Sequence, residues 1–247
     1  MKVNTLQFNN LIKHSPVEAV SSDVDYSNYY KKSHIGCDET GSGDFFGPLC
    51  VVACYIDARD IDWLISLGLH NPTEMDSNEV IKIAQEIKDR VIYSLLMLDN
   101  SHYNNFANEG NNLATIKAKL YNQAITNVMQ KLAMNNTLKI ANQFVSPKTY
   151  FNYLKNEVIV VKDLKFTKEG YDKYAAIMCA SILSRYAYYQ YFNNMSKALK
   201  IKIPRGTTST AEGVAVEIAN KYGFKMLHKV TKNNLTSFKR VKEALKK

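Results

Sequence analysis

The chain has 247 residues, a length that allows one large domain or one domain with a small appendage. Its 46% hydrophobic and 22% charged residues exclude wholesale disorder and a disulfide scaffold, and no apolar run approaches the length that spans a bilayer. The 32 Lys and Arg against 23 Asp and Glu give a net charge of +9, which favours a polyanionic partner such as nucleic acid.

The N-terminal end of the chain differs in character from the rest. Residues 1–33 are polar and weakly patterned, so we interpret them as a short arm before one main domain at residues 34–247. The first residues contain no apolar segment followed by a cleavage site, so no secretory signal is predicted and a cytoplasmic protein is expected. The four cysteines form no CxxC pair and no zinc-finger spacing, which predicts reduced, buried thiols.

Five segments of the main domain have the composition of strands. His34–Cys37 predicts a short first strand, and a glycine-rich loop follows it. The apolar run Leu49–Ile56, rich in β-branched residues, predicts a buried second strand. Three further strands are expected at Val91–Leu98, Leu138–Ala141 and Val158–Val161.

Apolar residues recur at helical spacing between and after these strands. Helices are expected at residues 78–90, at residues 111–134, in a segment opened by Pro147, at residues 170–199 and in two stretches at the C-terminus. A short loop joins the first two strands, so they are expected to be antiparallel, whereas strands reached through helices can be added in parallel. The sequence therefore predicts an α/β domain with a mixed five-stranded sheet, flanking helices and a helical C-terminal extension.

The strongest chemical signal is the acidic run Asp38–Asp44 (DETGSGD), directly after the first predicted strand. Adjacent carboxylates on a regular strand point to opposite faces, but at a frayed strand end they can converge on one site. Carboxylate oxygens suit Mg²⁺, and a Gly-Ser-Gly turn lets the backbone approach an anion closely. An exposed acidic turn without a function is the equally weighted alternative.

Three segments, in order along the chain, resemble the type 2 ribonucleases H and in particular ribonuclease HIII. They are IGCDETGSGDFFGPLCVVACYI at residues 35–56, GNNLATIKAKLYNQAI at residues 110–125, and FTKEG at residues 166–170 followed by AAIMCASILSRY. The resemblance implies a ribonuclease H-like fold. It also implies an endonuclease that hydrolyses the RNA strand of RNA/DNA hybrids with two divalent ions, Mg²⁺ or Mn²⁺.

The resemblance also assigns roles to individual residues. The family's metal-binding and catalytic positions correspond to Asp38, Glu39, Asn142 and Glu169. The residues expected to contact the substrate are Gly41, Ser42, Gly43, Lys117 and Lys168. For the two lysines, a solvated surface position is the alternative interpretation. The Ser42 hydroxyl could bind a phosphate or the 2′-hydroxyl that distinguishes RNA from DNA.

Asn142 departs from the family pattern, which has an aspartate before the Gln-Phe pair that fixes the register. An amide oxygen can bind a metal but carries no charge, so weaker binding of two ions is expected. The Coulomb scale is about 4 kcal/mol per charge pair at ~4 Å and an effective dielectric constant of ~20. Either the residue was introduced deliberately or it is natural, and both interpretations stay open. We hypothesise that Asp172, on the same helix face as Glu169, contributes instead.

Two further departures concern the binding of nucleic acid. Residues 1–33 are too few for the TBP-like domain that usually precedes the catalytic domain of ribonuclease HIII. The segment Asp76-Ser77-Asn78 resembles the family's Asp-Ser-Lys but lacks the lysine. Affinity for a hybrid is therefore expected to rest on the catalytic domain and on the basic tail Lys225–Lys247, for which a solvated helix is the alternative.

Together these features predict a monomeric hydrolase that acts on RNA/DNA hybrids and needs no membrane. The first alternative is an inactive homologue that still binds hybrids, and Asn142 is the feature that favours it. A small-molecule phosphatase is a third interpretation, and it would not require a basic surface.

Overall fold

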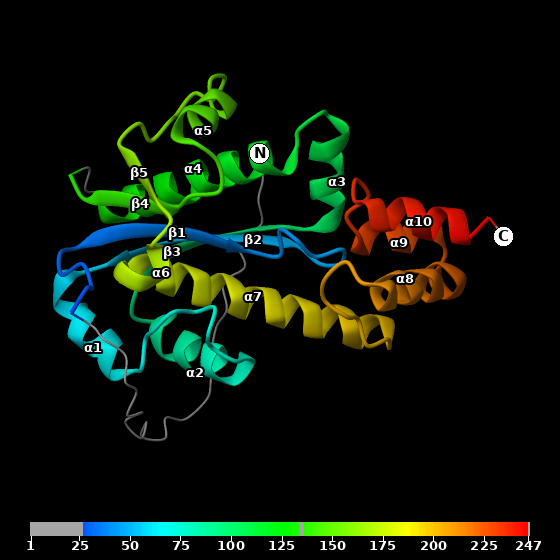
Figure 1. Cartoon of the computed structure of the whole chain (residues 1–247), viewed down its shortest axis with the longest axis horizontal. Coiled ribbons are helices and arrows are strands. Elements are labelled where there is room, and N and C mark those ends of the chain that lie inside the picture. The colour runs from blue at the N-terminus through cyan, green and yellow to red at the C-terminus, as the bar shows by residue number, and fades with distance from the viewer. Residues whose placement is uncertain (1–26, 134–135, 247) are drawn as a thin grey trace.

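A computed structural model describes residues 27–133 and 136–246, and its centre is one mixed sheet (Figure 1). The strands are β1 (His34–Thr40), β2 (Leu49–Ile56), β3 (Ile92–Leu98), β4 (Leu138–Asn142) and β5 (Leu164–Thr167). Their order across the sheet is β3-β2-β1-β4-β5. β2 pairs antiparallel with β1 and β3, whereas β4 pairs parallel with β1 and β5. The predicted mixed sheet is confirmed.

Helices cover both faces of this sheet. They are α1 (Ile61–Ser66), α2 (Ser77–Ile87), α3 (Asn100–Asn108), α4 (Leu113–Leu132), α5 (Pro147–Tyr153), α6 (Gly170–Lys173), α7 (Ala175–Leu199), α8 (Ser209–Tyr222), α9 (Phe224–Val230) and α10 (Thr236–Ala244), with a short 3₁₀ turn at Ala58–Asp60. In Figure 1, α4 and α5 lie on one side of the sheet, α1, α2 and α7 lie on the other, and α8–α10 lie at one end. None of the described helices is long and apolar enough to cross a membrane.

The alternation of side chains along β1 produces the two layers of the core. Ile35 and Cys37 are fully buried on the side of α4. Gly36 faces α7, and a Cβ atom there would lie 2.3 Å from the backbone carbonyl carbon of Ala176. The glycine and the small residues at the start of α7 therefore allow this helix to lie directly on the central strand. All four cysteines are buried and unpaired, as predicted.

The fifth strand lies later in the chain than the sequence predicts. The segment Val158–Val161 is irregular, with Val158 fully exposed at 100%. The side chain of Asn122 on α4 holds it, because this amide donates to the Ile159 carbonyl (2.7 Å) and accepts from the Val161 N–H (2.9 Å). An apolar β-branched run favours a strand, but here its backbone bonds to a helix side chain, and β5 at Leu164–Thr167 takes the place beside β4.

Other boundaries also differ from the predictions. The long helix expected at residues 170–199 is interrupted at Tyr174, whose backbone is extended (φ −116°, ψ 102°), so that α6 has only four residues. The first strand continues to Thr40, because its pairing with β2 extends to Thr40 and Cys50. Helices α1 and α3 were not expected, and the chain ends in three helical stretches instead of two. Most of the proposed N-terminal arm lies outside the described residues.

The C-terminal extension holds the loop that follows β1. Phe46 forms a β-bridge with Thr231. The Nζ atom of Lys232 donates to the carbonyl oxygens of Asp44 (2.8 Å) and Gly47 (2.9 Å), and this lysine is fully buried. Burial lowers the pKa of Lys232 to about 8. The extension is therefore part of the scaffold of this loop.

Two residues of the predicted basic tail, Lys232 and Arg240, are not free to bind a polyanion, which corrects the prediction at these positions. Lys232 is buried and does not face solvent. The guanidinium of Arg240 donates to the Glu212 carboxylate (2.8 Å) and is paired within the protein. Lys225, Lys229 and Lys239 are exposed, so part of the tail remains available to a polyanion.

Replacing Lys232 is expected to destabilise the fold. The substitution Lys232→Ala removes the donor from two carbonyl oxygens and leaves a cavity, which together cost about 3 kcal/mol of the free energy of unfolding. Urea denaturation of the variant measures this loss. The control Lys229→Ala removes an exposed lysine from α9 and is expected to change the free energy by less than about 0.5 kcal/mol. Equal stabilities of the two variants would contradict the role given to Lys232.

Candidate active site

Two adjacent carboxylates lie where β1 extends beyond its parallel partner. The pairing of β1 with β4 ends at Cys37 and Ala141, so the next residues of the two strands, Asp38 and Asn142, lie side by side at the carboxyl ends of parallel strands. β5 ends at the same edge, with Thr167 opposite Asn142. The first two residues of the predicted acidic run therefore belong to the strand itself, and the turn begins only after Thr40.

Asp38 is almost completely buried on the α7 side of the sheet, with 3% of its surface exposed. Its Oδ2 accepts a hydrogen bond from the Tyr171 hydroxyl (2.6 Å), and its Oδ1 accepts a long one from the Tyr121 hydroxyl (3.5 Å). Burial, together with the charge of Glu39, raises the pKa of Asp38 to about 7. Hydrogen bonds from Tyr171 and Ser181 oppose this increase in the pKa.

Glu39 points to the opposite side of β1 and is bound by α4. Its Oε1 forms an ion pair with Lys117, and its Oε2 accepts a hydrogen bond from Tyr121. The Lys117 ammonium lies 4.0 Å from the centre of the Phe144 ring. Lys117 is therefore buried and paired, and the interpretation of this residue as a solvated surface lysine is wrong. The Tyr121 hydroxyl contacts both carboxylates, which converge although they start on opposite faces.

A cavity of about 290 Å³, here called the acid cavity, opens beside this pair. It is lined among others by Asp38, Glu39, Lys117, Asn142, Lys168 and Tyr171. The structure thus brings together five of the residues predicted from the sequence. Tyr171 and Tyr121 were not predicted, because nothing in their spacing shows that their hydroxyls meet the two acids.

Glu169, the fourth predicted acid, does not line this cavity. It is exposed and precedes the short α6 instead of the long helix at which it was expected, because the chain is extended at Tyr174. Asp172 is exposed as well and lines neither cavity of the site. Within residues 27–133 and 136–246, no group of three or more His, Cys, Asp or Glu side chains is arranged to hold a metal ion. The assembled oxygen donors are two carboxylates and the amide of Asn142.

The side chain of Asn142 lies against the backbone that follows Glu169. A Cβ atom at Gly170 would lie 2.0 Å from the Asn142 Oδ1, so a side chain at this position would displace the amide. The amide of Asn142 therefore lies at the edge of the acid cavity, close to Gly170.

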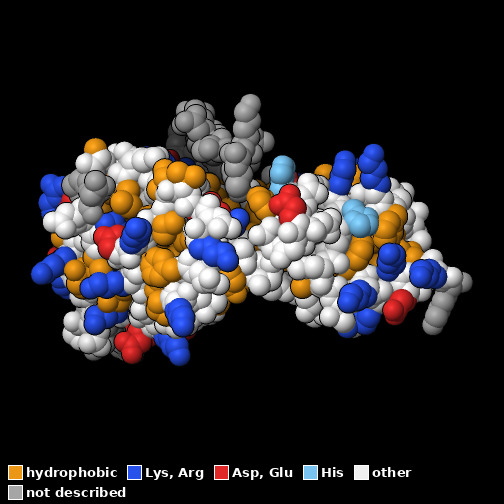
Figure 2. All heavy atoms as spheres, turned by 90° about the horizontal axis from the view of Figure 1, so that it is seen from above, with side chains coloured by type: hydrophobic (Ala, Val, Ile, Leu, Met, Phe, Trp, Pro, Cys, Tyr) orange, Lys and Arg blue, Asp and Glu red, His pale blue; other side chains and the backbone are white. Residues whose placement is uncertain are grey.

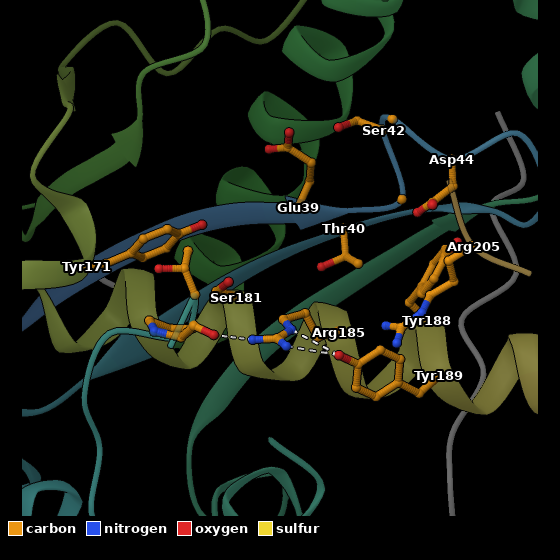
Figure 3. A pocket seen from close by; sticks show the side chains of 14 residues that line it. Glu39, Thr40, Ser42, Asp44, Tyr171, Ser181, Arg185, Tyr188, Tyr189 and Arg205 are labelled. Atoms are coloured by element: carbon orange, nitrogen blue, oxygen red, sulfur yellow. Dashed lines mark hydrogen bonds between the residues drawn. The ribbon is translucent and has the colours of Figure 1, made fainter. Parts of the chain in front are cut away.

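A second cavity of about 290 Å³, here called the arginine cavity, lies on the other side of Glu39 (Figure 3). The predicted substrate turn Gly41, Ser42 and Gly43 lines it. So do Arg185 and Arg205, which the sequence did not single out. Both cavities share Glu39 and Tyr171, so the acidic pair lies between them.

A helix-flanked mixed sheet, with two acids at the carboxyl end of its central strand, is the arrangement expected for the ribonuclease H-like class of proteins. The family model for Ribonuclease HII matches residues 35–241, and the chain belongs to this family. Ribonuclease HIII of Listeria monocytogenes is 35% identical over 231 residues, which cover 93% of this chain and 75% of the relative. Ribonuclease HIII of Bacillus thuringiensis subsp. konkukian is 33% identical over 243 residues, which cover 95% of this chain and 78% of that protein. The resemblance predicted from the sequence is confirmed.

Solved structures agree with this assignment. The crystal structure of Bst-RNase HIII in complex with Mn²⁺ has a TM-score of 0.84 and 26% identity, and the match covers 90% of this chain and 72% of that one. The ribonuclease H2 of Pyrococcus horikoshii, at 16% identity and a TM-score of 0.70, shares the fold. The oxygen donors at the acid cavity, two carboxylates and an amide, are of the kind that Mg²⁺ and Mn²⁺ prefer, so the residues present fit a divalent ion.

The raised pKa of Asp38 predicts how stability depends on pH. The ordinary pKa of this carboxyl is 3.8, and the folded value is about 7, so between these values the native state binds more protons than the unfolded state. The free energy of unfolding of the metal-free protein therefore falls as the pH rises from about 4 to 7. Asp38→Asn is expected to be more stable than the wild type at pH 7.5, on the order of 2 kcal/mol, and equally stable near pH 4.

Urea unfolding in a chelating buffer at both pH values tests this expectation. Asp172→Asn, which changes an exposed aspartate on α6, is the matched control and is expected to show no such gain at pH 7.5. If the free energies of unfolding of the wild type and Asp38→Asn differ by the same amount at both pH values, burial of the Asp38 charge does not destabilise the native state.

Proposed function

We propose that the chain is an endoribonuclease that hydrolyses the RNA strand of RNA/DNA hybrids and uses two divalent ions, Mg²⁺ or Mn²⁺. The observation that carries this proposal is the convergence of Asp38, Glu39 and Asn142 at one cavity. Membership of the ribonuclease HII family and the Mn²⁺ complex of a relative support it.

Asp38, Glu39, Asn142 and Glu169 would hold the ions. When bound, divalent ions activate a water molecule and stabilise the leaving oxygen of a phosphodiester. None of the described residues forms a hydrogen bond or ion pair with the side chain of Glu169, so this carboxylate gives up no partner when it becomes a ligand. Tyr171 and Tyr121 hold the carboxylates of Asp38 and Glu39 in position meanwhile.

Lys117 and Lys168 would bind phosphates of the substrate. Lys117 neutralises Glu39 in the structure, and a divalent ion on Glu39 would replace it in that role. The ammonium group, which lies in the acid cavity, would then pair with a substrate phosphate. Lys168 is exposed at the rim of the same cavity and can reach a second phosphate.

The turn after β1 would contact the backbone of the RNA strand. Gly41 has a positive φ of 92°, a conformation that side chains disfavour, and it lines the arginine cavity together with Ser42 and Gly43. Gly41 is buried against Pro48 and Tyr188, so its lack of a side chain allows this internal packing. Gly43 is exposed and a Cβ atom there would meet nothing within 4 Å, so a nucleic acid can approach its backbone. The Ser42 hydroxyl would bind a phosphate or a ribose 2′-hydroxyl.

Asn142 supports a second candidate function, a homologue that binds hybrids without cleaving them. Its neutral amide brings one negative charge fewer to two ions that together carry four positive charges. The amide, which lies close to Gly170, brings an oxygen to the cavity but no charge. Binding of a hybrid would then persist through the basic residues, while turnover would be lost.

The substitution Asn142→Asp separates the two functions. The added charge is expected to tighten binding of the divalent ions and to increase the cleavage rate at limiting metal by tenfold or more, since about 1.4 kcal/mol corresponds to a factor of ten. Cleavage of an RNA/DNA hybrid with labelled RNA, at a series of Mg²⁺ and Mn²⁺ concentrations, measures both effects. Asn152→Asp, on the exposed surface of α5, adds the same charge away from the site and is the control.

Each result has a distinct meaning. Cleavage by the wild type that Asn142→Asp accelerates supports the enzyme. Cleavage by Asn142→Asp alone, with binding by both proteins, supports the binding homologue. Absence of hybrid binding by the wild type would contradict both candidate functions.

A further inference from the structure

The arginine cavity is lined by two guanidinium groups, those of Arg185 and Arg205. Among the residues that the structure describes, neither Arg185 nor Arg205 forms an ion pair. Arg185 donates to the carbonyl oxygens of Pro72 and Met75 (3.2 Å to Met75) and to the Tyr189 hydroxyl (3.0 Å), all of which are uncharged acceptors. These bonds fix the guanidinium in place and leave its charge for a ligand.

Arg205 reaches the same space from the loop between α7 and α8. Its guanidinium lies 5.1 Å from the centre of the Tyr189 ring, and that of Arg185 lies 5.9 Å from it. Figure 3 shows both arginines and Tyr189 on one wall of the cavity. Two cations that share one aromatic ring form a compact region of positive potential.

The cavity is also lined by the carboxylates of Glu39 and Asp44, and each of them has another partner. Glu39 is ion-paired with Lys117 on the opposite side of the strand. The Oδ1 of Asp44 accepts a hydrogen bond from the backbone N–H of Gly206 and so holds the loop that carries Arg205. Ser42 also lines the cavity, and its hydroxyl adds a hydrogen-bond donor. Two guanidinium groups with a nearby hydroxyl fit an anion with several oxygens, which is the chemistry of a phosphate.

The position of this cavity indicates where the phosphate comes from. It adjoins the acid cavity, with Glu39 and Tyr171 between them, so a polymer bound across the acidic pair extends into it. A free anion would need only one cavity, whereas a nucleic acid backbone places phosphates in both. We propose that Arg185 and Arg205 bind a backbone phosphate of the nucleic acid, at a subsite separate from the cleavage site; this inference rests on the proposed function.

Arg205 is the residue to vary, because Arg185 also holds the turn at Pro72 and Met75. Binding of a labelled RNA/DNA hybrid is measured by fluorescence anisotropy in a chelating buffer, where no cleavage occurs. Arg205→Ala is expected to weaken binding about fivefold near 0.1 M salt and to reduce the slope of log K against log salt by about 0.9. The control Lys202→Ala removes an exposed cation of the same loop that does not line the cavity, and a less than twofold change is expected.

Hybrids that carry one uncharged methylphosphonate at successive positions identify the bound phosphate. At one position, the modification is expected to weaken binding by the wild type and by Lys202→Ala but not by Arg205→Ala. If every position affects all three proteins equally, the inference is overturned. If the wild type binds and cleaves the hybrid and Arg205→Ala binds it with the same affinity, this inference fails and the proposed function stands. If the wild type does not bind the hybrid, the proposed function itself fails.

Inorganic phosphate, added at constant ionic strength, distinguishes the source of the ligand. Millimolar phosphate is expected to leave the difference between the wild type and Arg205→Ala unchanged, because the backbone phosphate is held by the rest of the bound hybrid as well. Loss of that difference would assign the cavity to free phosphate and overturn the backbone assignment.

Discussion

Because Gly36 has no side chain, α7 lies directly on β1, and a Cβ atom at this position would be 2.3 Å from the helix backbone. The next residue on the same face is Asp38, whose carboxylate is consequently enclosed by α6 and α7 and bonded to Tyr171. The raised pKa of Asp38 follows from this enclosure. The same helix carries Arg185 to the neighbouring cavity, so both halves of the site depend on one close contact.

Much of the positive charge of the chain has an internal role. Lys117 is paired with Glu39, Lys232 holds two carbonyl oxygens of the loop after β1, and Arg185 holds two carbonyl oxygens of another loop. Figure 2 shows Lys and Arg side chains spread over the visible face rather than gathered in one patch. The net charge thus indicates a polyanionic partner but does not say where it binds. The local surroundings of a few cations decide that, because burial and pairing determine which charges remain available.

The loop between β1 and β2 is bonded to the C-terminal helical extension. The backbone of Phe45 bonds to Gly206 (3.2 Å) and that of Gly47 to Val230 (3.2 Å), and Lys232 adds two bonds from its side chain. The turn proposed to contact the substrate is therefore held by the residues around α8 and α9. The C-terminal helices thus support this turn although none of their acidic residues lines either cavity.

The sequence by itself determined the mixed sheet, the family and most of the acid cavity. These features depend on local patterns: continuous apolar runs, apolar residues at helical spacing, and a residue order that matches known relatives. The sequence could not place β5, the break at Tyr174 or the exposed position of Glu169, because a side chain of α4 and the extended backbone at Tyr174 decide them. Nor could it pair Lys117 with Glu39 or bring Arg185 and Arg205 together, because only tertiary packing joins residues so far apart in the chain.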